Sequence, residues 1–242
     1  MGQHVILRCF FLALGQMGDA RFRQVLVQGL LLTIGVLIAA YFAMSWLIGF
    51  FFGDGVVLPY FGEVQWVDEA LGIGTFFLIL AASVFLMIPV ASAFTSLFLD
   101  QVAQAVEDRH YPNLPRPQLI PFGDALRDTL GFLGVLIGAN LLALIVYLIV
   151  SPAAPFIFYA LNGFLLGREY FTLAAMRRLG RAGAKALRVR HRGTIWLAGI
   201  LMALPLTIPI LNLIVPILGA ATFTHLFHAL QSEDQQRGTS TS

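Results

Sequence analysis

The chain has 242 residues, of which 58% are hydrophobic and only 12% are charged. A soluble domain carries about 25% charged residues on average, so this composition excludes an ordinary soluble protein and predicts an integral membrane protein. The formal net charge is only +2, and the single cysteine, Cys9, excludes an internal disulfide and a cysteine-ligated metal cluster.

The N-terminal half begins with an apolar segment, residues 1–20, which Arg8 interrupts and which no A-x-A cleavage site follows. It predicts an amphipathic helix at the membrane interface rather than a signal peptide. Two charge-free stretches of 30 residues follow, at 24–53 and 70–99. A membrane span needs about 20 apolar residues, so each stretch predicts a transmembrane helix, the second extending to about residue 110.

The C-terminal half contains two longer charge-free stretches that prolines interrupt. The "SPAAP" sequence at 151–155 breaks the stretch 129–167, and Pro205 and Pro209 break the stretch 193–230. Proline removes a backbone donor, so each stretch predicts a helix, a turn and a second helix. The arm before Pro205 has 12 residues, and its length of about 18 Å is short of a hydrocarbon core of about 30 Å. These stretches therefore predict re-entrant or hemi-penetrating hairpins.

Together these elements predict an all-α integral membrane protein with a single membrane domain, residues 1–232. It comprises two long transmembrane helices and two proline-broken helical hairpins. Two alternatives stay open for the 129–167 hairpin, because residues 130–150 are also long enough to span the bilayer fully. The polar tail, residues 233–242, is expected to be disordered.

Charged residues are distributed unevenly between the loops. The loop 53–69 has four acidic and no basic residues, whereas the segment 168–192 has eight of the fifteen basic residues. The positive-inside rule places this basic helix and both termini in the cytoplasm, since each hairpin enters and leaves on one side. The basic segment is also suited to binding anionic headgroups of membrane lipids. The positive-inside rule alone explains its charge equally well.

Three sequence blocks resemble a known family. They are "AVEDRHYP" at 105–112, "LNGFLLGREYFTLAAMRR" at 161–178 and "IPILNLIVPILGAAT" at 208–222. They are similar to the CysZ-type sulfate permeases, which share their domain with the etoposide-induced membrane proteins. The resemblance covers residues 12–228, and the family fold likewise has two long transmembrane helices and two hemi-penetrating hairpins.

The resemblance implies a multi-pass protein of a bacterial inner (plasma) membrane that transports or conducts a small oxyanion, sulfate in particular, for sulfur assimilation. It also implies a homo-oligomer. The alternative is a non-transporting membrane protein that organises lipids or partner proteins, as expected of the eukaryotic branch. The chain has no P-loop, H-E-x-x-H or G-x-S-x-G motif. We therefore expect no enzyme, cofactor, metal site or nucleic-acid partner.

The family's sulfate-binding element is a Gly-Leu-Arg-Arg type motif that enters the first long helix. The matching stretch here is "DARFR" at 19–23, without the glycine. Arg23 aligns with an arginine of the motif, and Arg21 lies two residues before it. A helix N-terminus and forked arginine donors suit a tetrahedral dianion. Positive-inside anchoring is the other explanation for both residues.

Five further residues are candidates by their position at the ends or breaks of apolar runs. Asn162 and Asn212 lie beside the proline-broken turns and predict either amide donors that line a pore or interhelical hydrogen bonds. Glu107, Arg168 and Glu169 predict a polar gate that an Arg–Glu pair would order, or ordinary pairing at the surface.

Overall fold

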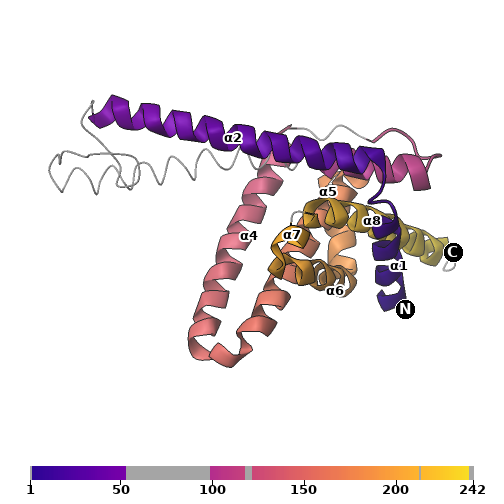
Figure 1. The fold of residues 1–242 in the computed structure, drawn as a ribbon. Coiled ribbons are helices and arrows are strands. Elements are labelled where there is room, and N and C mark those ends of the chain that lie inside the picture. Colours follow the sequence, from indigo (N-terminus) through magenta and orange to yellow (C-terminus); the bar gives the residue numbers. More distant parts are fainter. Residues whose placement is uncertain (1, 53–98, 118–121, 213, 240–242) are drawn as a thin grey trace. The chain divides into compact units, whose positions relative to one another are not determined.

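A computed structural model describes residues 2–52, 99–117, 122–212 and 214–239, and within these ranges every regular element is a helix (Figure 1). The all-α fold class is thus confirmed. The predicted transmembrane helix 70–99 lies outside the described residues, apart from its last residue. The chain divides into two compact units, one formed by Met1–Leu26 with Ser96–Ser242 and the other by Val27–Thr95.

The second unit holds most of α2 (Ala20–Phe52), which confirms the first predicted long helix. The segment Ala20–Ala43 is long and apolar enough to cross a membrane, and only 7% of its most apolar stretch of 18 residues is buried. Asp19 caps the helix, because its carboxylate accepts a hydrogen bond from the Arg21 backbone N–H at 3.0 Å. The cap fixes where the apolar helix begins.

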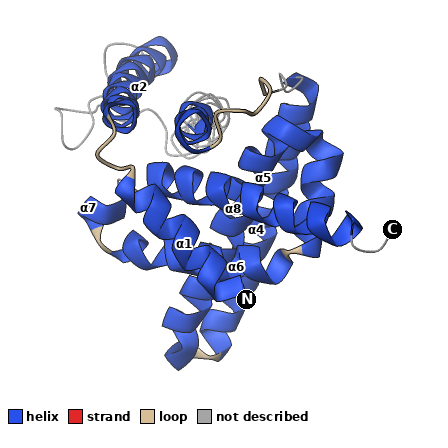
Figure 2. Cartoon of the chain, turned by 90° about the vertical axis from the view of Figure 1, so that its right-hand side faces the viewer, coloured by secondary structure: helices blue, strands red, loops and turns tan. Residues whose placement is uncertain are grey.

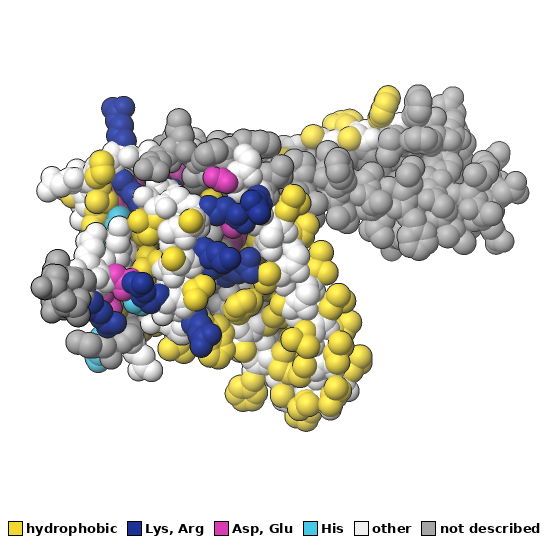
Figure 3. Space-filling view, turned by 180° about the vertical axis from the view of Figure 1, so that it is seen from behind, with side chains coloured by type: hydrophobic (Ala, Val, Ile, Leu, Met, Phe, Trp, Pro, Cys, Tyr) yellow, Lys and Arg dark blue, Asp and Glu magenta, His cyan; other side chains and the backbone are white. Residues whose placement is uncertain are grey.

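In the first unit, α4 (Phe122–Ile149), the 3-10 turn η2 (Ser151–Ala153) and α5 (Ala154–Arg190) form a helical hairpin. The break lies at the predicted proline sequence. The segment Arg127–Ile149 is the second of the described helices that is long and apolar enough to cross a membrane. Large apolar side chains are exposed along this hairpin (Figure 3), where a lipid environment would cover them.

The last part of the chain also follows the predicted break. It consists of α6 (Arg192–Ala203), the 3-10 turn η3 (Leu204–Thr207), α7 (Pro209–Asn212) and α8 (Val215–Thr239). A helix, a proline turn and a second helix are therefore present, and the re-entrant path through a membrane stays a prediction.

The C-terminal segment differs from the expected disordered tail, since α8 continues through Thr239. Ion pairs hold this extension against the end of α5. Asp234 accepts from Arg190 at 2.6 Å and lies 3.0 Å from His191 Nε2. These contacts are long-range in the sequence, so the polar composition of the tail gave no sign of them.

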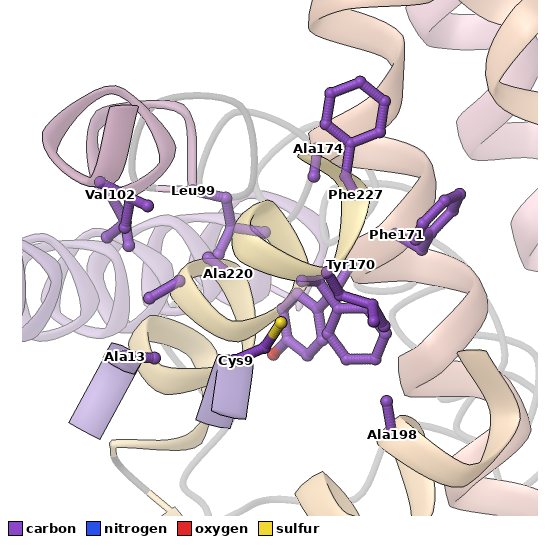
Figure 4. Close-up of a cluster of buried hydrophobic side chains, with 14 of the residues drawn as sticks. Cys9, Ala13, Leu99, Val102, Tyr170, Phe171, Ala174, Ala198, Ala220 and Phe227 are labelled. Carbon is purple, nitrogen blue, oxygen red and sulfur yellow. The ribbon is translucent and has the colours of Figure 1, made fainter. Parts of the chain in front are cut away.

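The core of the first unit forms where α1 (Gly2–Gly15), α5, α6 and α8 pack together with the segment 99–110 (Figure 2). Ile6, Cys9 and Ala13 recur every three or four residues and give α1 one buried stripe. Figure 4 shows Cys9 and Ala13 beside α8, while Tyr170 of α5 lies in the same cluster. Burial of this stripe fixes α1 on the helical core.

Backbone contact between α5 and α6 depends on glycine. A Cβ atom at Gly199 would lie 1.9 Å from the Gly163 carbonyl oxygen, and one at Gly167 would lie 2.6 Å from the Ile195 carbonyl oxygen. Real Cβ atoms do not approach so closely, so these helices pack with no room for a side chain. The indole N–H of Trp196 also donates to the Ala160 carbonyl at 2.9 Å.

Helix α5 changes direction within the basic segment. Gly180 has φ +65° and ψ −178°, which separates two helical halves. Positive φ is readily adopted by glycine and strains other residues. The change in direction brings the two halves of the basic segment close together, as Arg188 Nη1 donates to Thr172 Oγ1 at 2.9 Å.

Candidate functional site

Polar side chains recur along one face of the helical segment 99–110. Asp100, Gln104 and Glu107 are spaced four and three residues apart, so they lie on the same side of the helix. Glu107 is 2% exposed although it is a carboxylate. A buried carboxylate is costly without partners, so its surroundings must supply positive charge and donors.

Helix α5 supplies the first of two adjacent arginines. The Arg177 side chain is 4% exposed, and its Nε lies 2.9 Å from Asp100 Oδ1. Its Nη2 donates to Gln104 Oε1 at 2.8 Å and lies 3.5 Å from Glu107 Oε2. One arginine thus joins all three residues of the 99–110 face to α5.

Arg178 makes a forked contact with the same glutamate. Its Nε donates to Glu107 Oε1 at 3.0 Å and its Nη2 donates to Glu107 Oε2 at 2.6 Å. Its third contact is a hydrogen bond to the Pro115 carbonyl oxygen. Two parallel charge-assisted bonds fix the orientation of both side chains.

Helix α8 closes the site with two histidines, His225 and His228, which lie three residues apart on one face. His228 Nε2 lies 3.1 Å from Glu107 Oε1, and its ring centroid is 4.2 Å from that of Tyr111. The Tyr111 hydroxyl lies 3.1 Å from His225 Nδ1. We call the following set the Glu107 cluster: Asp100, Gln104, Glu107, Tyr111, Arg177, Arg178, His225 and His228.

The electrostatics of the cluster keep Glu107 ionised. Burial alone would raise its pKa, but hydrogen bonds from His228 and Arg178 and the charge of Arg177 lower the pKa to about 2. An ionised carboxylate only accepts hydrogen bonds, so the proton between the two side chains lies on His228 Nε2. The two arginine charges are balanced by Asp100 and Glu107. The arginine charges of the cluster are therefore balanced without a ligand, although Arg177 Nε and His225 Nε2 are buried with no hydrogen-bond partner among the described residues.

A hollow of about 500 Å³ opens beside the cluster. Its lining includes the arginines Arg21, Arg116 and Arg178 and the carboxylates of Glu107 and Asp108. We call it the Arg21 hollow. Arg21 pairs with Asp108 at 2.5 Å, and the two side chains are 61% and 45% exposed. An exposed pair of this kind is worth about 0–1 kcal/mol, so an anion in the hollow could replace Asp108 at little cost.

The other predicted anion-binding residues lie elsewhere. Arg23 is exposed, does not line the Arg21 hollow and makes no ion pair with the residues that the structure describes. Asn162 Nδ2 donates to the Phe158 carbonyl of its own helix at 2.9 Å. Asn212 is exposed on the short helix α7. The structure therefore brings only Arg21 of these candidates to the polar site.

The three residues expected at a gate are not brought together. Glu107 pairs with Arg178 and His228, whereas the Arg168 guanidinium lies 5.9 Å from the Phe132 ring centroid. Glu169 is half-buried and forms no ion pair within the described part of the chain. Glu107 thus pairs with Arg178 rather than with Arg168.

The contacts of Arg177, Arg178 and His228 with Glu107 were not predicted from sequence. The spacing on 99–110 would have shown which polar residues share a face. The side chains that pair with that face come from two distant helices, α5 and α8, and no local pattern identifies them. Among the described residues, no group of three or more His, Cys, Asp or Glu side chains is arranged to hold a metal ion.

Comparison with known proteins gives the family. A search of the curated proteins found no match. The model of the family described as Sulfate transporter CysZ/Etoposide-induced protein 2.4 matches residues 9–216 of the 242. The match includes Arg21, Glu107 and Arg178 and ends before the two histidines of α8. With most of its length matched, the chain belongs to the Sulfate transporter CysZ/Etoposide-induced protein 2.4 family.

Proposed function

We propose that the chain is a membrane transporter or channel for a small oxyanion, sulfate in particular. The observation that carries the proposal is a hollow lined by three arginines and two carboxylates in a member of the family described as Sulfate transporter CysZ/Etoposide-induced protein 2.4. Arginine offers forked donors that match the oxygens of a tetrahedral anion and stays charged at any physiological pH.

Within this proposal the arginines have different roles. Arg178 is held by the buried Glu107 and forms a fixed wall of the hollow. Arg21 is exposed, and within the described part of the chain its side chain pairs with the exposed Asp108 alone. A sulfate ion that enters the hollow would compete with Asp108 for the Arg21 guanidinium. Weak, replaceable pairing suits conduction, because an anion must leave as readily as it binds.

The proposal includes the location. We infer a bacterial inner membrane from the family resemblance. We place both termini in the cytoplasm because the basic residues are concentrated between 168 and 192. Assembly of several copies of the chain belongs to the same proposal and is supported by the family resemblance alone.

Uptake of radiolabelled sulfate into proteoliposomes tests the function. Wild-type protein should admit sulfate faster than protein-free vesicles. Arg21→Ala removes one charge-assisted hydrogen bond, worth about 1.5–3 kcal/mol, so uptake at low sulfate concentration should fall about tenfold or more. Arg23→Ala is the matched control, because it removes the same charge from the same end of α2.

Two results would count against the proposal in different ways. If wild-type protein admits no sulfate, the non-transporting alternative, which organises lipids or partner proteins, replaces it. If both variants lose uptake equally, Arg21 acts through general positive charge or topology, and the anion path does not include the Arg21 hollow.

A further inference from the structure

A second, smaller hollow of about 120 Å³ lies where α4 and α5 meet. Its charged lining consists of Asp128, Arg168, Arg181, Lys185 and Arg188. We call it the basic hollow. A hollow of this volume has room for several waters or for one small tetrahedral group.

The fold assembles this hollow from both halves of α5. Arg181, Lys185 and Arg188 are spaced four and three residues apart after Gly180, so they share one face. Arg168 and Thr172 are four residues apart before it. The positive φ of Gly180 redirects the chain, and the hydrogen bond from Arg188 to Thr172 at 2.9 Å joins the halves.

The positive charge of the basic hollow is not balanced by its own residues. One carboxylate, Asp128, faces four cations, and its Oδ1 lies 3.8 Å from Arg181 Nε. That Nε is buried and has no hydrogen-bond partner among the described residues. Burial and the charge of Arg168 lower the pKa of Arg188, and Asp128 opposes this change. An anion would supply both the missing charge and the missing acceptor.

The hollow lies at one end of an apolar helix. Asp128 is in the first turn of the candidate membrane span Arg127–Ile149. Figure 3 shows basic side chains gathered on one face of this unit, beside the apolar surface of the hairpin. The end of a span meets the layer of lipid headgroups, where phosphate groups are abundant.

We propose that the basic hollow binds the phosphate or sulfate group of one tetrahedral oxyanion, either free in solution or as the headgroup of an anionic lipid. The site is separate from the Arg21 hollow, with which it shares no lining residue. The inference does not depend on sulfate transport, because the excess of basic side chains in this hollow is present whether or not the protein conducts.

Two probes distinguish the sources of the group in the detergent-purified full chain. Equilibrium binding of radiolabelled sulfate tests the free anion, and native mass spectrometry with phosphatidic acid against phosphatidylcholine tests the headgroup. Arg181→Gln and Lys185→Ala each remove one cation of the hollow. Arg192→Gln is the control, because it removes an exposed charge from the adjacent α6, outside the hollow.

At least one probe should bind wild-type protein, and both hollow variants should weaken that binding about tenfold or more. The control should stay within about twofold. Lys185 is exposed, so its variant keeps the test valid if Arg181→Gln fails to fold. Binding of neither probe, or an equal loss in Arg192→Gln, would overturn the proposal. Loss of sulfate in Arg21→Ala with no loss in Lys185→Ala would assign the anion to the Arg21 hollow instead.

Discussion

Replacing Glu107 by glutamine should destabilise the protein more than replacing an exposed charged residue does. The carboxylate is 2% exposed and contacts three cationic or donor side chains, Arg177, Arg178 and His228. Glutamine keeps the volume and one acceptor oxygen. It removes the negative charge and turns an amide donor toward groups that are themselves donors.

The magnitude follows from burial. Removing one partner of a buried ion pair costs about 3–5 kcal/mol, because the remaining charge is left without compensation. The Arg177 and Arg178 side chains are 4% and 9% exposed, so water compensates little. A chain of this size loses about 2–4 °C of melting temperature per kcal/mol, so Glu107→Gln should melt roughly 6–20 °C below wild type.

Thermal unfolding of the detergent-solubilised protein measures the difference. Asp108→Asn is the matched control, because Asp108 lies next to Glu107 and pairs with Arg21 on the surface. That exposed pair is worth about 0–1 kcal/mol, so the control should fall by no more than about 4 °C. If Glu107→Gln melts as close to wild type as the control does, the cluster contributes no buried ion pairing and the reasoning fails.

Two further predictions concern pH and packing. The pKa of Glu107 falls from 4.5 to about 2 on folding, so its contribution of about 3 kcal/mol is complete above about pH 4.5 and is lost toward pH 2. Melting temperatures across that range should fall less steeply in Glu107→Gln. Gly199→Ala places a Cβ 1.9 Å from the Gly163 oxygen and should cost about 3 kcal/mol, whereas Gly134→Ala, with open space around it, should melt like wild type.

Much of the fold follows from local rules that the sequence displays. Proline cannot continue a helix, and "SPAAP" and Pro205 mark the two observed breaks. The apolar length of 24–53 predicts the long helix α2. The change of direction at Gly180 was not predicted, because a glycine within a basic helix can equally adopt helical backbone angles. The close contact at Gly199 was missed for a similar reason, since no local pattern tells which glycines meet another backbone.

The candidate site was predicted less well than the fold because its residues meet through long-range contacts. Glu107 lies 71 residues from Arg178 and 121 residues from His228 in the chain. The sequence predicted Glu107 either in a polar gate with Arg168 and Glu169 or in ordinary pairing at the surface. In the structure it is buried against Arg177, Arg178 and His228. Arg21 was predicted as an anion-binding residue from its place at the start of α2. The hollow beside it was not predicted, because its other walls include residues of the 99–110 segment, which the sequence does not place next to Arg21.

The basic residues of α5 take part in two charge arrangements that the positive-inside rule does not distinguish. Before Gly180, Arg177 and Arg178 are paired with Asp100 and Glu107, so their charges are balanced within the protein. Across Gly180, the basic hollow holds four cations against one carboxylate. Positive-inside anchoring requires only that these charges stay on one side of the membrane, and it gives no reason for them to converge on one partly open hollow. Convergence of like charges is unfavourable unless water or a bound anion compensates it, so the charge balance, rather than the number of basic residues, separates the paired cluster from the hollow that we propose binds an anion.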